Sequence, residues 1–399
     1  MAVSRTDALA RDTADPLAGF RDRYVLDDGD RIYVDGNSLG RLPVAGRAAI
    51  AATTEEWGRD LVGGWSRWID APLRAGDEIA HLIGARPGEV IVCDSVTVNL
   101  YKLAWAALDV RQGAIVVHPD DFPTDRYVLA GLAAARDRSV TEPGTVGTAA
   151  LVCRSLVDFR SGELLDGPRV TAEAHQAGAL MLWDLCHAAG AVPVELEAWG
   201  ADLAVGCTYK YLNAGPGAPA FLYVRQELQE LLRSPIQGWF SHADQFAMGP
   251  DYEPAPGIVR FLAGTPGIIG VDAVQAGAAE VAAAGIQPLR AKSIALTELA
   301  IALHDERLAP LGFQLGTPRD PARRGSHVSF RHPDAWRICQ ALIEQAHVIP
   351  DFRPADVIRF GLPAVYTRFV DVYDAIDRLA VLVEREAHHA YDLRRARVT

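Results

Sequence analysis

The sequence predicts an α/β protein with a large domain built on a mostly parallel sheet and a smaller α+β domain. Between about residues 88 and 224, short apolar runs alternate with segments of helical periodicity, as in a parallel sheet covered by helices on both faces. Beyond about residue 286 the pattern changes to one long helix followed by short strands around another helix. A chain of 399 residues accommodates both parts, because a single core stops growing at roughly 250–300 residues.

Each predicted element corresponds to one run of residues. In the large domain the predicted strands are residues 90–92, 114–117, 149–153, 179–183, 203–207 and 220–224, and the helices between them include 99–108, 126–136 and 170–177. The later elements are a helix at 289–305, strands at 327–330 and 357–360, and a helix at 335–345. Residues 1–45 are predicted to be extended and to pack on the small domain. The predicted domains are therefore 46–285, and 1–45 together with 286–399.

Composition and charge exclude several classes of protein. A net charge of −12 and the absence of a Lys/Arg block argue against nucleic-acid binding. The first 20 residues lack the apolar core of a signal peptide, and the most apolar helix, at 271–285, carries Asp272 and Glu280, so no membrane span is predicted. Five widely spaced cysteines without a CxxC pair predict reduced, buried thiols in a cytoplasmic protein, namely Cys93, Cys153, Cys186, Cys207 and Cys339.

A lysine and an aspartate follow two of the predicted strands. Lys210 comes after the apolar run 201–207, and Asp184 comes directly after 179–183. An amine and a carboxylate at strand ends predict pyridoxal 5′-phosphate (PLP), where the lysine forms a Schiff base and the aspartate keeps the pyridine nitrogen protonated. Only three of the 39 basic residues are lysines, and arginine forms no imine. Alone, Lys210 is equally well explained as a strand-edge cation paired with an acid; Asp184 favours the cofactor.

The other two lysines are interpreted as structural. Lys102 has helical spacing that predicts a partly solvated position on the side of a helix, and Lys292 lies in another amphipathic helix. Neither follows a predicted strand.

Several polar segments border the predicted site. Residues 94–97, between a strand and a helix, offer backbone N–H groups and hydroxyls for a phosphate, although Ser95 is also an ordinary N-cap. Phe122, at the start of the segment FPTD, could place its ring on the cofactor or belong to a simple Pro-Asp turn. His187 is predicted to hydrogen-bond Asp184 or touch the cofactor, unless it is structural. The Tyr209 hydroxyl suits a phosphate or the cofactor phenolate.

An amino-acid substrate also needs a partner for its α-carboxylate, and the planar guanidinium of arginine suits that role. Arg359 in the small domain is the candidate, with Arg368 as the alternative. The segment GNSLG at 36–40 matches the nucleophile elbow of serine hydrolases with Ser38 as nucleophile. Because Pro43 follows within a turn and almost nothing precedes it, we interpret it as a glycine turn at the mouth of the site, with Ser38 a possible substrate contact.

Together these motifs resemble kynureninase, a PLP-dependent enzyme of the aspartate aminotransferase-like fold (fold type I). The matching segments run in order along nearly the whole chain: YVDGNSLG (33–40), DSVTVNL (94–100), FPTD (122–125), DLCH (184–187), CTYKYLN (207–213), GWFSH (238–242), GTP (264–266) and YTRFVDV (366–372). The resemblance implies a mixed, mostly parallel seven-stranded sheet flanked by helices. Ser241 and Asp158 depart from the family pattern, where glycine and asparagine are expected.

The resemblance also implies roles for individual residues. The catalytic residues would be Lys210, Asp184 and Tyr209. The implied cofactor contacts are Val96 and Thr97 at the phosphate, Phe122 on the ring, and Thr124, Asp125, Ser155, Asp184, His187, Tyr209 and Lys210. Trp239 and Thr265 would reach the cofactor from a partner subunit, which implies a homodimer with shared active sites. Ser38 and His242 would lie near the substrate, and Arg359 would hold its α-carboxylate. No metal is implied.

The activity implied is hydrolytic cleavage of the Cβ–Cγ bond of L-kynurenine, 3-hydroxykynurenine or a substituted kynurenine in tryptophan catabolism. The products would be L-alanine and the corresponding anthranilate. Transamination or β-elimination on an aromatic amino acid, the Ser38 hydrolase, and a catalytically silent binding protein are the alternatives.

Overall fold

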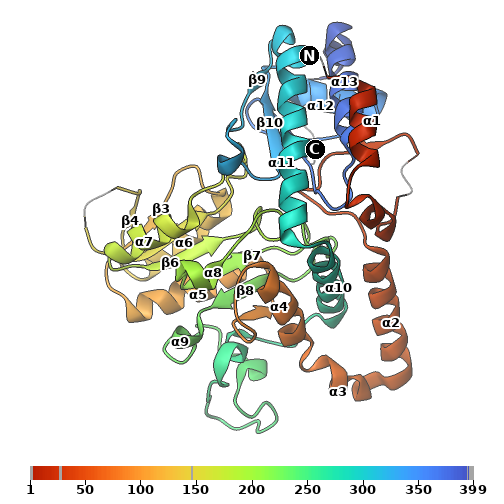
Figure 1. Cartoon of the computed structure of the whole chain (residues 1–399). Helices are drawn as coiled ribbons and strands as arrows, with labels where there is room; N and C mark the ends of the chain where they lie inside the picture. The colour runs from red at the N-terminus through yellow and green to blue at the C-terminus, as the bar shows by residue number, and fades with distance from the viewer. Residues whose placement is uncertain (1–2, 27–28, 145–146, 393, 395–399) are drawn as a thin grey trace.

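A seven-stranded mixed sheet forms the centre of the larger half of the molecule (Figure 1). The computed structural model describes residues 3–26, 29–144, 147–392 and 394. The strand order is β2-β8-β7-β6-β5-β3-β4, in which β8 runs antiparallel to both neighbours and the other adjacent pairs are parallel. The strands are β2 (Val90–Val92), β3 (Ala114–Val117), β4 (Val140–Thr141), β5 (Ala149–Ser155), β6 (Leu180–Asp184), β7 (Leu203–Gly206) and β8 (Phe221–Val224).

Helices cover both faces of this sheet, because successive strand residues point to opposite sides and both sides are apolar. Leu180 and Leu182 share one core with α5 and α6, whereas Met181 and Trp183 share the other core with α4, α7 and α10. The helices of this half are α2 (Val44–Asp60), α3 (Trp65–Trp68), α4 (Ala71–Leu82), α5 (Val96–Val110), α6 (Pro123–Ala135), α7 (Gly167–Gln176), α8 (Leu196–Trp199), α9 (Gln226–Gln229) and α10 (Ile268–Ala284).

The smaller half contains a four-stranded antiparallel sheet in the order β12-β13-β10-β9. Its strands are β9 (Gln314–Leu315), β10 (His327–Arg331), β12 (Asp351–Arg353) and β13 (Val357–Gly361), and its helices are α11 (Ile286–Leu303), α12 (Ala335–Gln345) and α13 (Phe369–Glu384). The long helix α11 runs from the large sheet to the far end of this half (Figure 1). A separate parallel pair joins β1 (Ile32–Tyr33) to β11 (Val348–Ile349).

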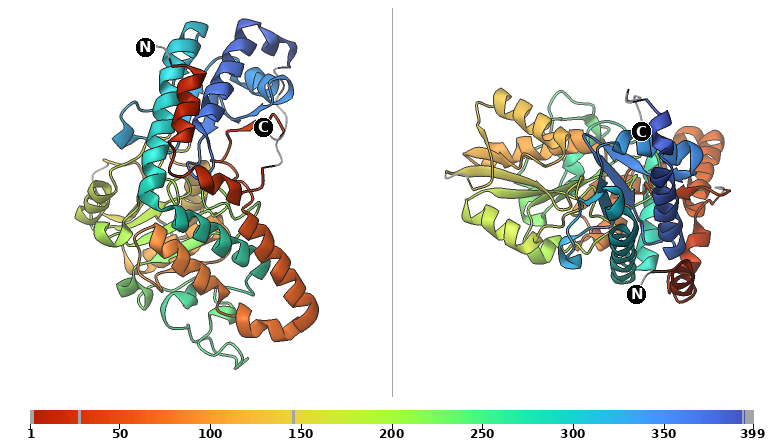
Figure 2. Two further views of the ribbon diagram at one scale, coloured as in Figure 1. Left: turned by 45° about the vertical axis from the view of Figure 1, so that its right-hand side comes forward. Right: turned by 90° about the horizontal axis from the view of Figure 1, so that it is seen from above.

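The N-terminal segment is not extended as predicted, because α1 (Arg5–Thr13) forms with a capping box between Ser4 and Asp7. It packs against α13, beside which it lies in Figure 1 and in the left view of Figure 2. The carboxylate of Asp12 accepts the first N–H groups of α13, from Phe369 (2.6 Å) and Val370 (3.0 Å), so the segment adds distant acceptors to the local one that Asp371 provides. The local sequence pattern did not predict α1, because this helix is stabilised by packing against α13, which is distant in the sequence.

The remaining predicted elements agree with the structure to within a few residues at each end, except that two-residue strands such as β4 and β9 were too short to predict. All five cysteines are free, but Cys186 is only half-buried, contrary to prediction. None of the described helices is alone long and apolar enough to cross a membrane. Only the bent pair Ile268–Ala284 and Ile286–Leu311, with 79° between its parts, would satisfy length and composition together.

Candidate active site

Asp184 lies at the carboxyl end of β6 and is almost fully buried, with 5% of its surface exposed. Its Oδ1 accepts the N–H of Cys186 at 2.8 Å, and its Oδ2 lies 3.3 Å from the Ser155 hydroxyl. Ser155 is the register partner of Asp184 on the neighbouring strand β5, so the sheet itself fixes this contact. The carboxylate is therefore held in one orientation at the sheet edge.

Lys210 lies in the loop after β7, and its Nζ is 3.3 Å from Nε2 of His187. Among the described residues His187 thus hydrogen-bonds Lys210 and not Asp184, so of the two predicted alternatives the contact with the cofactor remains. Burial, and then the charge of Lys210, lower the pKa of His187 well below its usual value. A neutral imidazole can accept a hydrogen bond from the Lys210 ammonium, so the two groups are compatible neighbours.

A cavity of about 340 Å³ opens above these residues. It brings together most of the predicted cofactor contacts: Val96, Thr97, Phe122, Thr124, Asp125, Asp184, His187, Tyr209 and Lys210. The Lys210 Nζ lies 6.0 Å from the centroids of both the Phe122 and Tyr209 rings. Ser155 reaches the cavity indirectly, through Asp184. The charge of Cys207 and burial raise the pKa of Tyr209, so its hydroxyl stays protonated and can donate a hydrogen bond.

The first turn of α5 supplies one wall of the cavity. Ser95 caps this helix by accepting the N–H of Val98 at 3.3 Å, as predicted. Lys102 lies further along α5. It is fully buried, whereas the sequence predicted a partly solvated position. Its Nζ contacts the Asp94 carboxylate and the Phe261 carbonyl, each at 2.6 Å. These contacts hold residue 94, whose φ is +49°, at the helix start.

Asp125 has both carboxyl oxygens buried without a hydrogen-bond partner among the described residues. Burial and the neighbouring Asp184 carboxylate raise its pKa well above the usual value. A buried group of this kind is costly unless something fills the space beside it. A polar cavity that holds a fixed carboxylate, an available amine and a helix N-terminus fits a phosphorylated pyridine aldehyde such as PLP.

Arg359 on β13 is completely buried outside the cavity lining. Its Nε donates to Asp351 Oδ2 at 2.6 Å, its Nη1 donates to the Phe159 carbonyl, and its Nη2 lies 3.4 Å from the Ser38 hydroxyl. The Phe159 ring packs edge-on against Phe122 with centroids 5.2 Å apart, which links this arginine to the cavity wall.

Asp351 and Phe159 were not predicted as members of the site. Asp351 faces Arg359 in register across β12 and β13, a pairing that cannot be recognised before the strands are aligned. Arg368, the alternative carboxylate ligand, is already paired with Asp371 at 2.6 Å at the start of α13.

The GNSLG segment is a turn, and the next helix begins only at Val44, so Ser38 is not on a nucleophile elbow. The N–H of Gly40 donates to the Tyr209 carbonyl at 2.7 Å. A Cβ at Gly40 would lie 2.3 Å from the Lys210 carbonyl oxygen, so only glycine permits this approach. The segment therefore packs directly against the backbone that carries Lys210.

Both departures from the family pattern have structural partners. Asp158 accepts hydrogen bonds from the Ser161 N–H and hydroxyl, each at 2.6 Å, and so shapes the turn that presents the Phe159 carbonyl to Arg359. The Ser241 hydroxyl donates to the Gly238 carbonyl at 2.8 Å within its own turn. Neither side chain lines the cavity.

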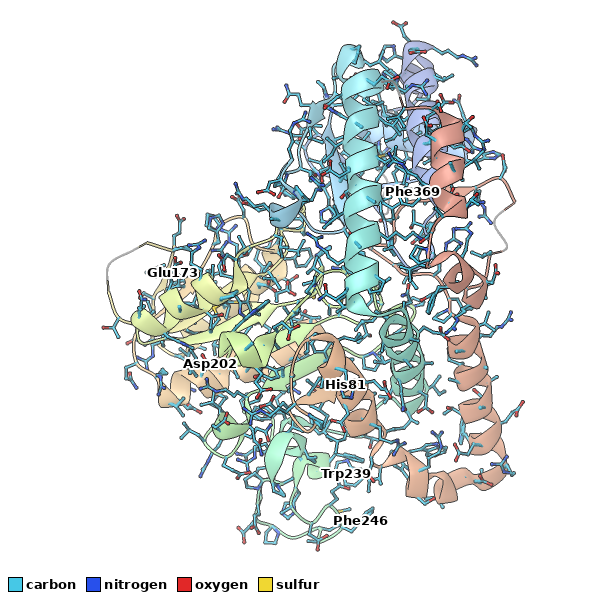
Figure 3. All side chains as sticks on the ribbon, viewed as in Figure 1. His81, Glu173, Asp202, Trp239, Phe246 and Phe369 are labelled. Carbon is cyan, nitrogen blue, oxygen red and sulfur yellow. The ribbon has the colours of Figure 1, made fainter. Side chains whose placement is uncertain are left out.

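Trp239, His242 and Thr265 also lie outside the lining of the Lys210 cavity within one chain. Trp239 and His242 line a separate hollow of about 300 Å³, and Trp239 lies with Phe246 at one end of the molecule (Figure 3). Thr265 lines a third hollow of about 310 Å³, which shares Asp94 and Gly217 with the Lys210 cavity. This adjacency places Thr265 nearer to the site than Trp239.

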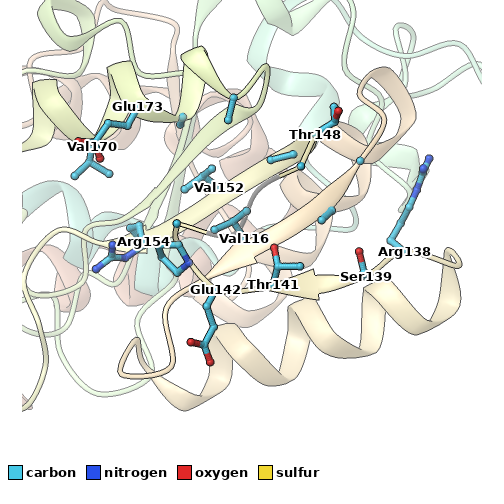
Figure 4. A pocket seen from close by; sticks show the side chains of 18 of the residues that line it. Val116, Arg138, Ser139, Thr141, Glu142, Thr148, Val152, Arg154, Val170 and Glu173 are labelled. Carbon is cyan, nitrogen blue, oxygen red and sulfur yellow. The ribbon is translucent and has the colours of Figure 1, made fainter.

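A larger cavity, about 520 Å³, lies between α7 and strands β3, β4 and β5 (Figure 4). Arg154, Glu142 and Glu173 contribute charged groups to it, but its described lining contains neither lysine nor histidine. Without a lysine it offers no amine for an imine, so size alone does not identify the cofactor site.

Comparison with solved structures identifies the fold class of the protein. The chain superposes on a cysteine desulfurase from Thermococcus onnurineus with a TM-score of 0.80 and 19% identity, covering 96% of this chain and 100% of that one. It also superposes on an Escherichia coli cysteine desulfurase with a TM-score of 0.77 and 18% identity, over 92% and 98% of the two chains. The fold is that of the fold type I PLP-dependent enzymes.

Sequence relatives identify the family within that class. The chain is 44% identical to a kynureninase from Pseudomonas fluorescens over 96% of both chains, and 43% identical to one from Burkholderia pseudomallei over 97% of both. The family model "Kynureninase C-terminal domain" matches residues 289–379. This chain belongs to the kynureninase family, as the motifs predicted.

Proposed function

We propose that this chain binds PLP in the Lys210 cavity and hydrolyses the Cβ–Cγ bond of L-kynurenine or a ring-substituted kynurenine. The products are L-alanine and anthranilate, or 3-hydroxyanthranilate from 3-hydroxykynurenine, within tryptophan catabolism. One observation carries the proposal: Lys210, Asp184 and His187 meet in one cavity of a chain that is 44% identical to a kynureninase along nearly its whole length.

The residues present would hold the cofactor as follows. Asp184 would pair with the protonated pyridine nitrogen, and the N–H groups at Val96 and Thr97 would bind the phosphate at the start of α5. Phe122 would cover the ring. When bound, PLP supplies an aldehyde for Lys210 and withdraws electrons from the substrate α-carbon.

The chain's own groups then position the substrate and move protons. Lys210 is the general base for the α-proton, and the neutral ring of His187 holds its amine by a hydrogen bond. Tyr209 lines the same cavity, and its protonated hydroxyl would donate a hydrogen bond to the phosphate or the phenolate of the cofactor. Arg359, with Ser38 beside it, binds the α-carboxylate, which requires the guanidinium to exchange part of its present set of partners.

The proposed domains are residues 46–285, and 1–45 with 286–399. All seven strands of the large sheet fall within the first range and the four-stranded sheet within the second. Helix α1 belongs with the second range, because Arg5 pairs with Asp374 of α13 at 2.7 Å.

The active enzyme is proposed to be a homodimer in which Trp239 and Thr265 of one chain complete the cavity of the other. The loop that carries Trp239 also exposes 70% of Phe246 and 72% of Met248, an apolar surface typical of an interface. Mixing Lys210→Ala with Trp239→Ala subunits tests this, because a mixed dimer contains one site free of both changes. Turnover of the mixture well above that of either variant supports shared sites, and none above the two variants contradicts them.

A cytoplasmic location is proposed from the cysteines. All five are free thiols, and Cys186 lines the catalytic cavity. Free thiols are typical of a reducing compartment.

The activity is tested by an end-point assay of the PLP-loaded protein with L-kynurenine and 3-hydroxy-L-kynurenine offered separately. Equimolar L-alanine and anthranilate, lost in Lys210→Ala, are expected, and the faster substrate identifies the ring preference. Alanine that forms only when a keto acid is supplied would instead indicate transamination. A protein that binds PLP but releases neither product contradicts the proposed reaction and leaves the fold intact.

A further inference from the structure

A cluster of two histidines and an aspartate lies outside the catalytic cavity, in the small half of the molecule. Asp334 immediately precedes α12, and His388 and His389 belong to the short 3-10 helix η8 (Ala387–Ala390) that follows α13. One ligand atom from each residue lies within 4.8 Å of the other two. The fold thus brings together residues more than fifty positions apart in the sequence.

His388 is an unusual member of this cluster because one of its ring nitrogens is buried without a hydrogen-bond partner among the described residues. Only 3% of its surface is exposed, and its buried Nδ1 has no partner. Its recorded contacts among the described residues are ring contacts with His332 and His389. A buried imidazole nitrogen with no hydrogen-bond partner costs free energy, and an ion or water is the usual explanation.

The geometry suits a small divalent cation. The His388 and His389 rings converge with centroids 4.2 Å apart, after a backbone reversal at Glu386, whose φ is +52°. In a tetrahedral site with Zn–N bonds near 2.0–2.1 Å, neighbouring ligand atoms are about 3.4 Å apart. The cluster must therefore contract by about 1.4 Å at most. His389 is exposed and Asp334 half-buried, so two of the three side chains can make that movement.

The ligand set selects the class of metal. Two imidazole nitrogens and one carboxylate favour zinc and similar transition metals, whereas Mg²⁺ and Ca²⁺ prefer sites made of oxygen atoms. Arg337 is the competing cation, but its Nη1 is 3.7 Å from the Asp334 carboxylate, a long ion pair that leaves an oxygen available. His332 lies beside the cluster with its Nδ1 accepting the Asp334 N–H at 3.0 Å, which orients the loop.

We propose that Asp334, His388 and His389 form a binding site for a zinc-class divalent metal. The site joins the turn after α13 to the start of α12 and leaves a further coordination position for water. Since α12 packs against the sheet that carries Arg359, the metal stabilises the small half of the molecule without entering the catalytic cavity.

The test is calorimetric titration of the tag-free, PLP-loaded protein with ZnCl₂, and separately with MgCl₂. About one Zn²⁺ per chain is expected, with a rise in Tm of about 4 °C at a hundredfold excess over Kd, and no binding of Mg²⁺. His389→Ala and Asp334→Asn should each weaken Zn²⁺ binding at least tenfold. His81→Ala, which removes an exposed histidine on α4, is the matched control and should bind as the wild type does.

Turnover of kynurenine is measured in the same variants and should not change, so this test is independent of the proposed activity. His389 is exposed, and its removal should not prevent folding; a far-ultraviolet spectrum identical to the wild type checks this. Absence of Zn²⁺ binding, or Zn²⁺ affinity reduced less than tenfold by both substitutions, overturns the proposal. Binding lost equally in His81→Ala overturns it too, because that result indicates nonspecific surface histidines.

Discussion

Two lysines lie near the same cavity in very different surroundings. Lys102, on α5, is fully buried, and its ammonium is bound by the Asp94 carboxylate and the Phe261 carbonyl at 2.6 Å each. Lys210, after β7, is only partly buried, and among the described residues its amine has one hydrogen-bonding neighbour, His187 at 3.3 Å. The difference separates a lysine that holds the structure together from one that is available to react.

Lys292 confirms the pattern on the structural side. It is buried on α11 and paired with Asp15 at 2.7 Å, so it joins the N-terminal segment to a distant helix. A structural lysine has its donors satisfied by fixed acceptors, because a buried, unpaired ammonium is costly. Lys210 has few such acceptors, and that is the condition under which its amine can form and release a covalent bond.

The largest expected effect comes from Lys210→Ala. Removing the amine removes both the covalent attachment and the general base, so turnover should fall by about 10³-fold or more. The free energy of unfolding without cofactor should change by less than about 1 kcal/mol, since the side chain has few fixed contacts. Product assays and urea unfolding of the cofactor-free protein measure the two quantities.

Lys210→Arg is the matched control, because it keeps the charge and loses the imine chemistry. Turnover in the arginine variant should be as low as in the alanine variant. If Lys210→Arg retained activity near the wild-type level, the lysine would act only as a cation, and its contrast with Lys102 would disappear.

Lys102→Met should have the opposite profile. The change leaves the Phe261 carbonyl and the Asp94 carboxylate without their partner, so unfolding should become easier by about 3 kcal/mol. The folded fraction should still attach PLP to Lys210 and turn substrate over within about tenfold of the wild type. Urea unfolding, with cofactor absorbance at saturating PLP, checks both; a normal stability would show that the buried pair is energetically neutral.

Arg359 is the hardest case for this comparison, because it is buried and bonded like Lys102 but is proposed to bind substrate. Arg359→Lys loses the bidentate fork, so KM for L-kynurenine should rise about 10- to 100-fold. The control is Arg368→Lys. Because the guanidinium of Arg368 is already paired with Asp371, this substitution should leave KM unchanged. If Arg359→Lys lowered the Tm and left KM unaltered, Arg359 would belong with Lys102 as a structural cation.

Sequence patterns predicted six of the seven strands of the large sheet, because those strands are short, mostly apolar runs. Asp184 and Lys210 could be recognised as strand-end groups for that reason. The helical N-terminus was missed because α1 is stabilised by α13, from which it is separated by more than 350 residues. The burial of Lys102 was missed because Phe261, which accepts its hydrogen bond, is contributed by a distant 3-10 helix, η4 (Gly257–Phe261).

The surroundings of Arg359 were not predictable for a related reason. Asp351 becomes its partner only when β12 and β13 align, and the Phe159 carbonyl reaches it from a turn in the larger half. Side-chain chemistry at strand ends is visible in a sequence, whereas contacts that depend on strand register or on loops meeting across the molecule are not.

Carboxylates divide in the opposite way to the lysines, with a smaller expected effect, because here the cofactor-site residue has the fixed partners. Asp184 has its oxygens engaged by Cys186 and Ser155, whereas Asp35 has a buried Oδ1 without a hydrogen-bond partner among the described residues. Burial and the charge of Asp351 raise the pKa of Asp35 to about 7, despite the opposing effects of Ser38, Arg359 and Arg353.

The raised pKa of Asp35 determines how this residue makes stability depend on pH. Because the pKa of Asp35 is higher in the folded chain than in the unfolded one, the folded state binds more protons, and the contribution of Asp35 is complete below about pH 4. It is lost as the pH rises through about 7. Urea unfolding at pH 5 and pH 8 should show that Asp35→Asn loses about 1–2 kcal/mol less stability over this interval than the wild type. Equal losses in both proteins would mean that Asp35 is already ionised at pH 5 and that its pairing with Arg359 outweighs the repulsion from Asp351.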